Sequence, residues 1–68
     1  MKTYNIKVFF DIRQQVYRKC DPDKYMYIVV AFIVDEKDIL YKITGISGDF
    51  YCYHFEIEDY NNRHAELN

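Results

Sequence analysis

Apolar and polar residues alternate at the start of the chain. Every second residue from Tyr4 to Ile12 is apolar, and most of the residues between them are polar. A period of two with β-branched and aromatic members predicts a half-buried strand over residues 3–13. Residues 14–20 either extend this strand or form a loop. Residues 21–24 (Asp-Pro-Asp-Lys) predict a type I turn, because proline presets φ at the second position and the first aspartate can bond back to the turn backbone.

The rest of the chain reads as three further strands. The segments follow as strand, polar connection, strand, glycine-bounded turn and strand, at residues 25–34, 35–38, 39–44, 45–49 and 50–57. The first of these strands is apolar on both faces, which is typical of a central strand. Residues 59–67 form either a short helix with Asp59 as its N-cap or a frayed tail. The pattern predicts an all-β or β-rich α+β fold, a single four-stranded antiparallel sheet arranged as a meander.

The turns predict the register of the sheet. Pairing Val34 with Ile39 and Thr44 with Phe50 gathers one apolar face, because residues opposite each other share a face. The expected core is Met26, Ile28, Val30, Phe32, Val34, Ile39, Tyr41, Ile43, Tyr51, Tyr53, Phe55 and Ile57. The first strand fits this core only if a bulge or break between Asp11 and Val16, at residues 14–15, returns its apolar side chains. The alternative is a sheet that curls into a small barrel.

The opposite face of the predicted sheet is also apolar. It carries Tyr25, Tyr27, Val29, Ala31, Ile33 and Leu40, mixed with Lys42, Thr44, Phe50, Cys52 and His54. A surface of this kind is too apolar to leave in water, so we expect a second copy, a curled sheet or a partner protein to cover it. Tyr25 and Tyr27 are the expected partner contacts on this face, because tyrosine joins a large apolar area to a hydrogen-bonding tip.

Composition limits the class of protein. Sixty-eight residues allow one domain, residues 1–68, and thirteen aromatic residues favour dense packing as the stabilising device. Cys20 and Cys52 are expected to be reduced thiols of a cytoplasmic protein, since small secreted scaffolds carry more cysteines. No signal peptide is expected, and the longest apolar run is half the roughly twenty residues of a membrane helix. Residue types with AT-rich codons are frequent, which suggests an AT-rich genome such as that of a phage or another mobile element.

Charge gives the second candidate surface. The net charge of −2 disfavours sequence-independent nucleic-acid binding, which normally needs a basic face. In the meander, acidic residues collect at one end of the sheet and form either a solvated rim or a docking surface for a basic partner. This acidic pole comprises Asp35, Glu36, Asp38, Glu56, Glu58 and Asp59, with Asp11 as a further candidate.

The sequence contains no motif that specifies catalysis, a metal or a cofactor. Cys52 and His54 share a strand face, but with Cys20 or His64 they lack the paired knuckles of a zinc site. We therefore expect a non-enzymatic protein-binding module that modulates or inhibits a host protein, a nucleic-acid-binding one being a fitting target. One alternative is a single-stranded nucleic-acid-binding protein that uses Tyr25, Tyr27 and Phe50. The other is a structural homo-oligomeric subunit. We expect a homodimer both for the protein-binding module and for the structural subunit.

Overall fold

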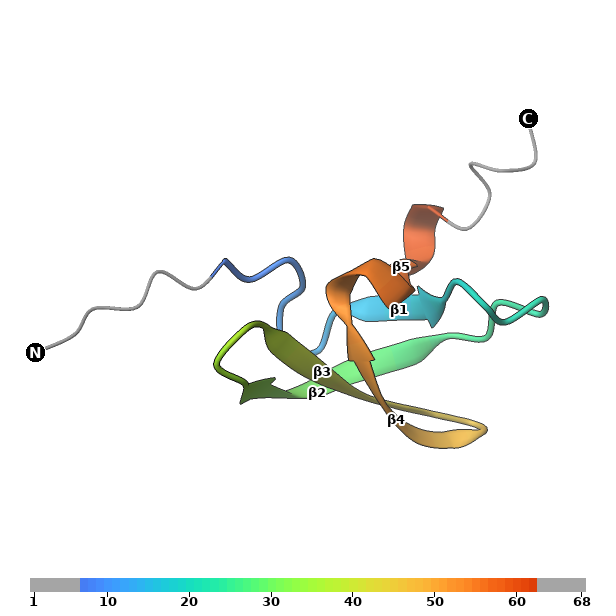
Figure 1. The fold of residues 1–68 in the computed structure, drawn as a ribbon. Helices are drawn as coiled ribbons and strands as arrows, with labels where there is room; N and C mark the ends of the chain where they lie inside the picture. Colours follow the sequence, from blue (N-terminus) through green and yellow to red (C-terminus); the bar gives the residue numbers. More distant parts are fainter. Residues whose placement is uncertain (1–6, 63–68) are drawn as a thin grey trace, which may run out of the picture.

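The computed structural model describes residues 7–62 as a single five-stranded antiparallel sheet (Figure 1). The elements are β1 (Gln15–Arg18), β2 (Tyr27–Val34), β3 (Ile39–Gly45), β4 (Gly48–Tyr53), the 3-10 turn η1 (His54–Glu56), β5 (Ile57–Asp59) and the 3-10 turn η2 (Tyr60–Asn62). The strand order is β4-β3-β2-β1-β5. The β-rich antiparallel class is confirmed, but the sheet has five strands where four were expected.

The predicted turns are present where the polar segments indicated them. The Lys24 amide donates to the Asp21 carbonyl oxygen at 3.2 Å, and the Asp21 carboxylate accepts from the amides of Asp23 and Tyr25. The Asp35 amide donates to the Asp38 carbonyl oxygen at 2.8 Å and closes the β2–β3 hairpin. Local side-chain bonding of this kind is why aspartate favours turns.

The N-terminal segment departs from the prediction. Residues 7–13 form no strand, and residues 3–6 lie outside the described part of the chain. The break expected between Asp11 and Val16 is present as a turn, in which the Gln14 amide donates to the Asp11 carbonyl oxygen at 3.1 Å. This turn separates residues 7–13 from the paired strand, which begins only at Gln15.

A bulge lies in β2 and not in the first strand. Val29 pairs with Ile43 and Ala31 pairs with Lys42, so Val30 is an extra residue without an opposite partner. A single extra residue reverses which side chains point inward along the rest of the strand. Phe32 therefore faces the core as expected, whereas Tyr27 and Val29 also face it, which reverses the prediction for the first half of β2.

The β3–β4 pairing is one residue away from the predicted register. Thr44 pairs with Asp49, and Ile43 pairs with Phe50, because Gly45 lies opposite Gly48 and the turn between them holds only two residues. The slip places Cys52 in the core and turns Tyr51 outward. The predicted core is wrong for residues that are exposed or only half-buried, namely Met26, Ile28, Val30, Val34, Tyr51, Tyr53 and Phe55.

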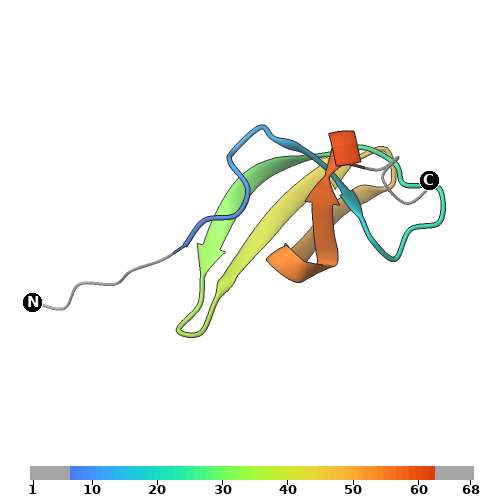
Figure 2. The ribbon, with the colours of Figure 1, turned by 90° about the horizontal axis from the view of Figure 1, so that it is seen from above.

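The core joins residues from all five strands. It consists of Val16, Tyr27, Val29, Ile39, Tyr41, Ile43, Cys52 and Ile57, with Phe10, Phe32 and Phe50 packed against it. One cluster can include both edge strands only if the sheet curls on itself. Figures 1 and 2 show this curl, with the chain turning back after β4 so that β5 and β1 lie across the other three strands. The sheet is therefore curled, but β4 and β5 do not pair with each other, so it does not close into the small barrel named as the alternative.

The C-terminal part of the predicted fourth strand is interrupted. The turn η1 separates β4 from β5, and β5 returns to pair with β1 instead of continuing along β3. Asp59 ends β5, and its carboxylate accepts from the Asn61 amide at 2.8 Å in the 3-10 turn that follows. The short helix expected over residues 59–67 is thus a 3-10 turn as far as residue 62, and the rest lies outside the described residues.

Candidate protein-interaction surface

Cross-strand pairing builds an apolar surface on the outside of the curled sheet. Ile33 pairs with Leu40, which pairs with Tyr53, and these three residues therefore form one outward row. The next row consists of Ala31, Lys42 and Tyr51. Phe55 follows in η1, with its ring stacked on that of Tyr53 at 5.6 Å and an interplanar angle of 9°. We call Ile33, Leu40, Tyr51, Tyr53 and Phe55 the outer patch.

Two aromatic members of the outer patch are open to solvent, and the third, Tyr53, is half-buried. Tyr51 is 54% exposed and Phe55 is 59% exposed. The ammonium group of Lys42 lies 5.9 Å from the centre of the Tyr51 ring and 4.0 Å from the Asp49 carboxylate. Large aromatic side chains that bury this little of their area gain little from folding, so their exposure points to another role.

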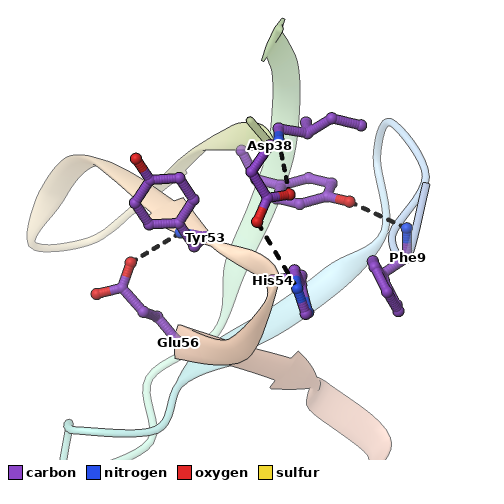
Figure 3. Close-up of polar contacts among 7 residues, drawn as sticks. Phe9, Asp38, Tyr53, His54 and Glu56 are labelled. Atoms are coloured by element: carbon purple, nitrogen blue, oxygen red, sulfur yellow. Dashed lines mark hydrogen bonds and ion pairs between the residues drawn. The ribbon is translucent and has the colours of Figure 1, made fainter. Parts of the chain in front are cut away.

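The turn η1 is held in place by polar and aromatic contacts (Figure 3). The Tyr53 amide donates to the Glu56 carboxylate at 2.8 Å, which fixes the start of the turn. The His54 Nε2 atom lies 3.9 Å from the Asp38 carboxylate, and the imidazole ring stacks on the Phe9 ring at 4.1 Å. These contacts tie η1 to the β2–β3 loop and to the N-terminal segment, so the position of Phe55 is set from both sides.

The N-terminal segment closes one end of the curled sheet. The Phe9 amide donates to the hydroxyl oxygen of Tyr41 at 3.0 Å. The rings of Phe10 and Phe32 each meet the Tyr41 ring edge to face, at 5.5 Å. The buried tyrosine thus keeps a hydrogen-bond partner, which is the usual condition for burying its hydroxyl group.

Arg18 lies at a second aromatic cluster in the curled sheet. Its guanidinium carbon is 4.0 Å from the centre of the Phe50 ring, and its side chain hydrogen-bonds to that of Tyr27. Burial raises the pKa of the nearby Cys52 thiol, and the charge of Glu56 adds to this effect while Arg18 opposes it. Cys52 is therefore held as a neutral thiol inside the core, and Cys20 is exposed.

The predicted acidic pole divides into two groups. Asp35, Glu36 and Asp38 lie in the β2–β3 loop, and the contact between Asp38 and His54 brings this loop to η1 and Glu56. Glu58 and Asp59 instead lie on β5, and Asp59 accepts from the Gln14 side chain at 2.8 Å. The register sets Asp59 level with Val16 and the start of β2, away from the β2–β3 loop, so the expectation of one acidic end is wrong for these two residues.

The predicted tyrosine contacts also separate. Tyr25 is exposed in the segment before β2, as expected for a surface residue. Tyr27 is 1% exposed and belongs to the core, so the expectation that it lies on an open face is wrong. Its ring meets that of Phe50 edge to face at 5.6 Å, and Phe50 is half-buried.

Sequence reasoning missed Tyr51, Tyr53 and Phe55 as surface residues. The available signal was the spacing of Gly45 and Gly48, because two residues between paired glycines form the commonest kind of hairpin loop. Reading that loop as two residues long would have set the register of β4 and turned both tyrosines outward.

The described residues form neither a cluster of metal ligands nor a membrane-spanning helix. Within residues 7–62, no three His, Cys, Asp or Glu side chains are placed to hold a metal ion together. The same part of the chain has no helix of the length and apolar character that a membrane crossing requires.

Comparisons with protein-family models, curated proteins and solved structures found no match to this chain, so the surface geometry carries the functional argument.

Proposed function

We propose that this chain is a non-enzymatic protein-binding module and that the outer patch is its binding surface. The observation that carries the proposal is the exposure of Tyr51 on β4 and of Phe55 in the hydrogen-bonded turn η1 that follows it. Aromatic residues on rigid elements dominate the energetics of protein interfaces, because they bury a large area at a small cost in side-chain entropy.

The size of the outer patch suits the centre of an interface. Two half-exposed aromatic rings offer on the order of 200 Å² of apolar area, given that each aromatic side chain can bury about 150–250 Å². A standard interface buries about 800 Å² on each partner, with an apolar centre and a polar rim. The outer patch would supply that centre, and the β2–β3 loop and η1 would supply part of the rim.

The charges around the outer patch favour a basic partner. Asp35 and Glu36 are exposed in the loop that follows β2, and Glu56 is exposed beside Tyr53. Lys37 is the basic residue of the same loop, and Lys42 is close to Asp49. An acidic rim speeds encounter with a basic surface and makes association depend on salt concentration. A basic surface is typical of nucleic-acid-binding proteins, and a host protein of that class remains the proposed target.

Site-specific photo-crosslinking tests this proposal. A photoreactive phenylalanine analogue is placed at position 51 or 55, and at position 46 as a matched control, since Ile46 is an exposed apolar residue in the β3–β4 turn. The expected result is one protein adduct shared by positions 51 and 55 and absent at position 46. The proposal fails if neither patch position gives an adduct, or if all three positions give the same set.

The acidic rim is tested with the partner that the crosslink identifies. Replacing Asp35, Glu36 and Asp38 together by their amides should slow association and flatten its dependence on salt, while dissociation changes less. The matched control replaces Asp21 and Asp23 in the turn before β2. A partner whose association rate and salt dependence are unchanged by the loop substitutions would remove the rim from the proposal.

A further inference from the structure

The strand β2 has a backbone edge that no described strand occupies. On the side facing β1, pairing covers only Tyr27 and Ile28, and Val29 is bonded to the backbone of Arg13 and Gln14. Residues 11–14 form a turn, and Phe10 before it packs on the Tyr41 ring without strand pairing to this edge. Among residues 7–62, the stretch from Ala31 to Val34 is therefore paired with β3 alone.

The direction of the backbone groups on this edge follows from the hairpin. The Asp35 amide donates to the Asp38 carbonyl oxygen, so these two residues form a hydrogen-bonded pair of the antiparallel ladder. Hydrogen-bonded and non-hydrogen-bonded pairs alternate, which directs the backbone groups of Ala31 and Ile33 toward β3. The N–H and C=O groups of Phe32 and Val34 therefore point to the open edge.

This edge lacks the features that usually prevent pairing between sheets. Residues 30–34 (Val-Ala-Phe-Ile-Val) contain no charge and no proline, and Val30, Ile33 and Val34 are exposed. Soluble proteins protect such edges with charges, prolines, short strands or a covering segment. The bulge at Val30 bends β2 before this stretch, but it leaves the stretch itself in regular register with β3.

The other two edges of the sheet are better protected. The β4 edge carries Asp49 near its start, and at its end the Glu56 carboxylate accepts from the Tyr53 amide. The β5 edge has only three residues, and two of them are Glu58 and Asp59. The second half of β2 is thus an apolar stretch of edge in the described chain that has neither a charged residue nor a side-chain cap.

We propose that a second copy of this chain pairs with β2 along this edge in antiparallel orientation. Pairing centred on Ile33 sets Phe32 opposite Val34 of the second copy, and Val34 opposite its Phe32. The four residues whose backbone groups point to the open edge then bond to one another. Any antiparallel pairing of a strand with itself is two-fold symmetric, so both copies use the same surface and the assembly closes as a dimer.

Charge and length at the ends of the edge support a second copy as the occupant. In this register Asp35 of the second copy lies opposite Ala31, and its hairpin turn of Glu36 and Lys37 extends beyond that pair toward the level of Val30. The position beside Val29, further along the same edge of β2, is held by Arg13, whose amide donates to the Val29 carbonyl oxygen at 2.6 Å. The incoming hairpin therefore brings Asp35 and Glu36, together with Lys37, to the end of the edge where the turn presents an arginine, and symmetry repeats this contact at the other end.

The interface is small, which defines the affinity to expect. Two short strands contribute a few backbone hydrogen bonds and the Ile33 contact. The area that they bury is smaller than the roughly 1,200 Å² of a stable standard interface. We expect a dimer that dissociates on dilution through the micromolar range. Pairing through β2 would also join the outer patches of the two copies into one continuous surface.

Sedimentation velocity and hydrogen exchange over a dilution series test the dimer. The mass should rise from 8.3 kDa at low concentration to twice that value at high concentration. The amides of Phe32 and Val34 should become protected over the same range, while those of exposed Ile46 and Ser47 should not. A monomer at millimolar concentration, or a dimer in which amides 32 and 34 exchange as in the monomer, overturns the proposal.

Two substitutions separate the β2 edge from any other association. Val34→Pro removes an amide that points to the open edge, and it should raise the dissociation constant at least tenfold while leaving the β2–β3 ladder intact. Val34→Thr keeps the amide and the side-chain shape, and it should leave association unchanged. Undiminished association of folded Val34→Pro would place the interface elsewhere, and if this variant fails to fold, the exchange of amides 32 and 34 in the natural chain decides.

A charge exchange tests the register. Arg13→Glu should weaken self-association, and mixing it with a Glu36→Arg chain should restore association between unlike chains. Asp11, the acidic residue of the same turn, is left unchanged in both variants. A mixture that associates no better than either variant by itself would contradict the pairing centred on Ile33.

Discussion

Replacing Tyr27 by alanine and replacing Tyr51 by alanine should have very different effects on stability. The two tyrosines are both on strands, and alternation of the sequence alone places Tyr51 in the core and Tyr27 outside it. The structure reverses these positions through the bulge at Val30 and the two-residue turn between β3 and β4. The pair of substitutions therefore tests the register directly.

The magnitude for Tyr27 follows from its burial. The side chain is 1% exposed, packs edge to face against Phe50 and accepts a hydrogen bond from Arg18. Truncating a buried aromatic residue to alanine costs about 3–5 kcal/mol, including the cavity that remains. A chain of this length is stable by roughly 3–10 kcal/mol on a per-residue basis, so Tyr27→Ala should be largely unfolded or close to it.

The magnitude for Tyr51 is much smaller. Its ring is 54% exposed, and its described partner is the ammonium group of Lys42. Exposed cation–π contacts are worth about 0.5–1 kcal/mol, so Tyr51→Ala should cost no more than about 1 kcal/mol. Thermal and urea unfolding measure both values, and about 1 kcal/mol corresponds to roughly 4–8 °C in Tm for a small domain.

A milder variant protects this test against complete unfolding. Tyr27→Phe keeps the ring and removes the hydroxyl oxygen that accepts from Arg18, which should cost about 0.5–1.5 kcal/mol. The expected order of stability is the natural chain, then Tyr51→Ala close to Tyr27→Phe, and Tyr27→Ala far below. If Tyr51→Ala lowered stability as much as Tyr27→Ala, the proposed register of β4 and the outward position of Tyr51 would be wrong.

Four further predictions concern the packing around the core. Gly45→Ala should destabilise the fold by about 1–3 kcal/mol in urea unfolding, because its Cβ atom would lie 2.6 Å from the Tyr27 ring and 2.8 Å from a backbone carbonyl oxygen; an unchanged midpoint would contradict this packing. Cys20 should react at once with a thiol reagent, whereas Cys52 should react only after unfolding, and equal rates in the folded protein would refute its burial. Burial raises the pKa of Cys52, so the neutral thiol contributes its full stabilisation below the ordinary thiol pKa and loses it as the pH rises through the raised value. The stability difference between the natural chain and Cys52→Ala should therefore shrink at alkaline pH. A difference that stayed constant would show that the thiol is solvated. Tyr41→Phe removes the hydroxyl oxygen that accepts from the Phe9 amide, and it should cost about 1 kcal/mol while speeding hydrogen exchange at that amide alone. Unaltered exchange at the Phe9 amide would show that the contact is not formed in solution.

The sequence predicted the class of the fold and most of the turns. Asp21 and Pro22 specify their turn through local chemistry, and the polar run from Asp35 to Asp38 closes the β2–β3 hairpin as expected. The half of β2 nearest that hairpin also has the predicted register, with Phe32 opposite Tyr41. Features that depend on neighbours in sequence were therefore predictable.

The errors share a physical cause. A strand side chain changes face with each inserted residue, so one bulge at Val30 and one shorter turn after Gly45 exchanged several residues between core and surface. Nothing in the local composition of β2 marks Val30 as the extra residue. The pairing of β5 with β1 is equally a long-range event, and it is what moved Glu58 and Asp59 away from the predicted acidic pole.

The candidate surface was predictable only in part. Ala31, Ile33, Leu40 and Lys42 were expected on one face and are found there. Their aromatic neighbours could not be assigned without the correct register of β4. The acidic loop at Asp35 and Glu36 was correctly expected to be exposed, because a hairpin connection of charged residues remains in solvent in any register of the strands.

Calorimetric titration of the crosslinked partner tests the central claim most directly. The natural chain is compared with the double variant Tyr51→Ala and Phe55→Ala. The control is Ile46→Ala, which removes an exposed apolar side chain outside the outer patch. Buried aromatic contacts at the centre of an interface are worth about 2 kcal/mol or more each, so the double variant should lose about 4 kcal/mol and bind roughly a thousandfold more weakly. The control should bind as the natural chain does. Equal affinities for all three chains would show that the outer patch is not the binding surface.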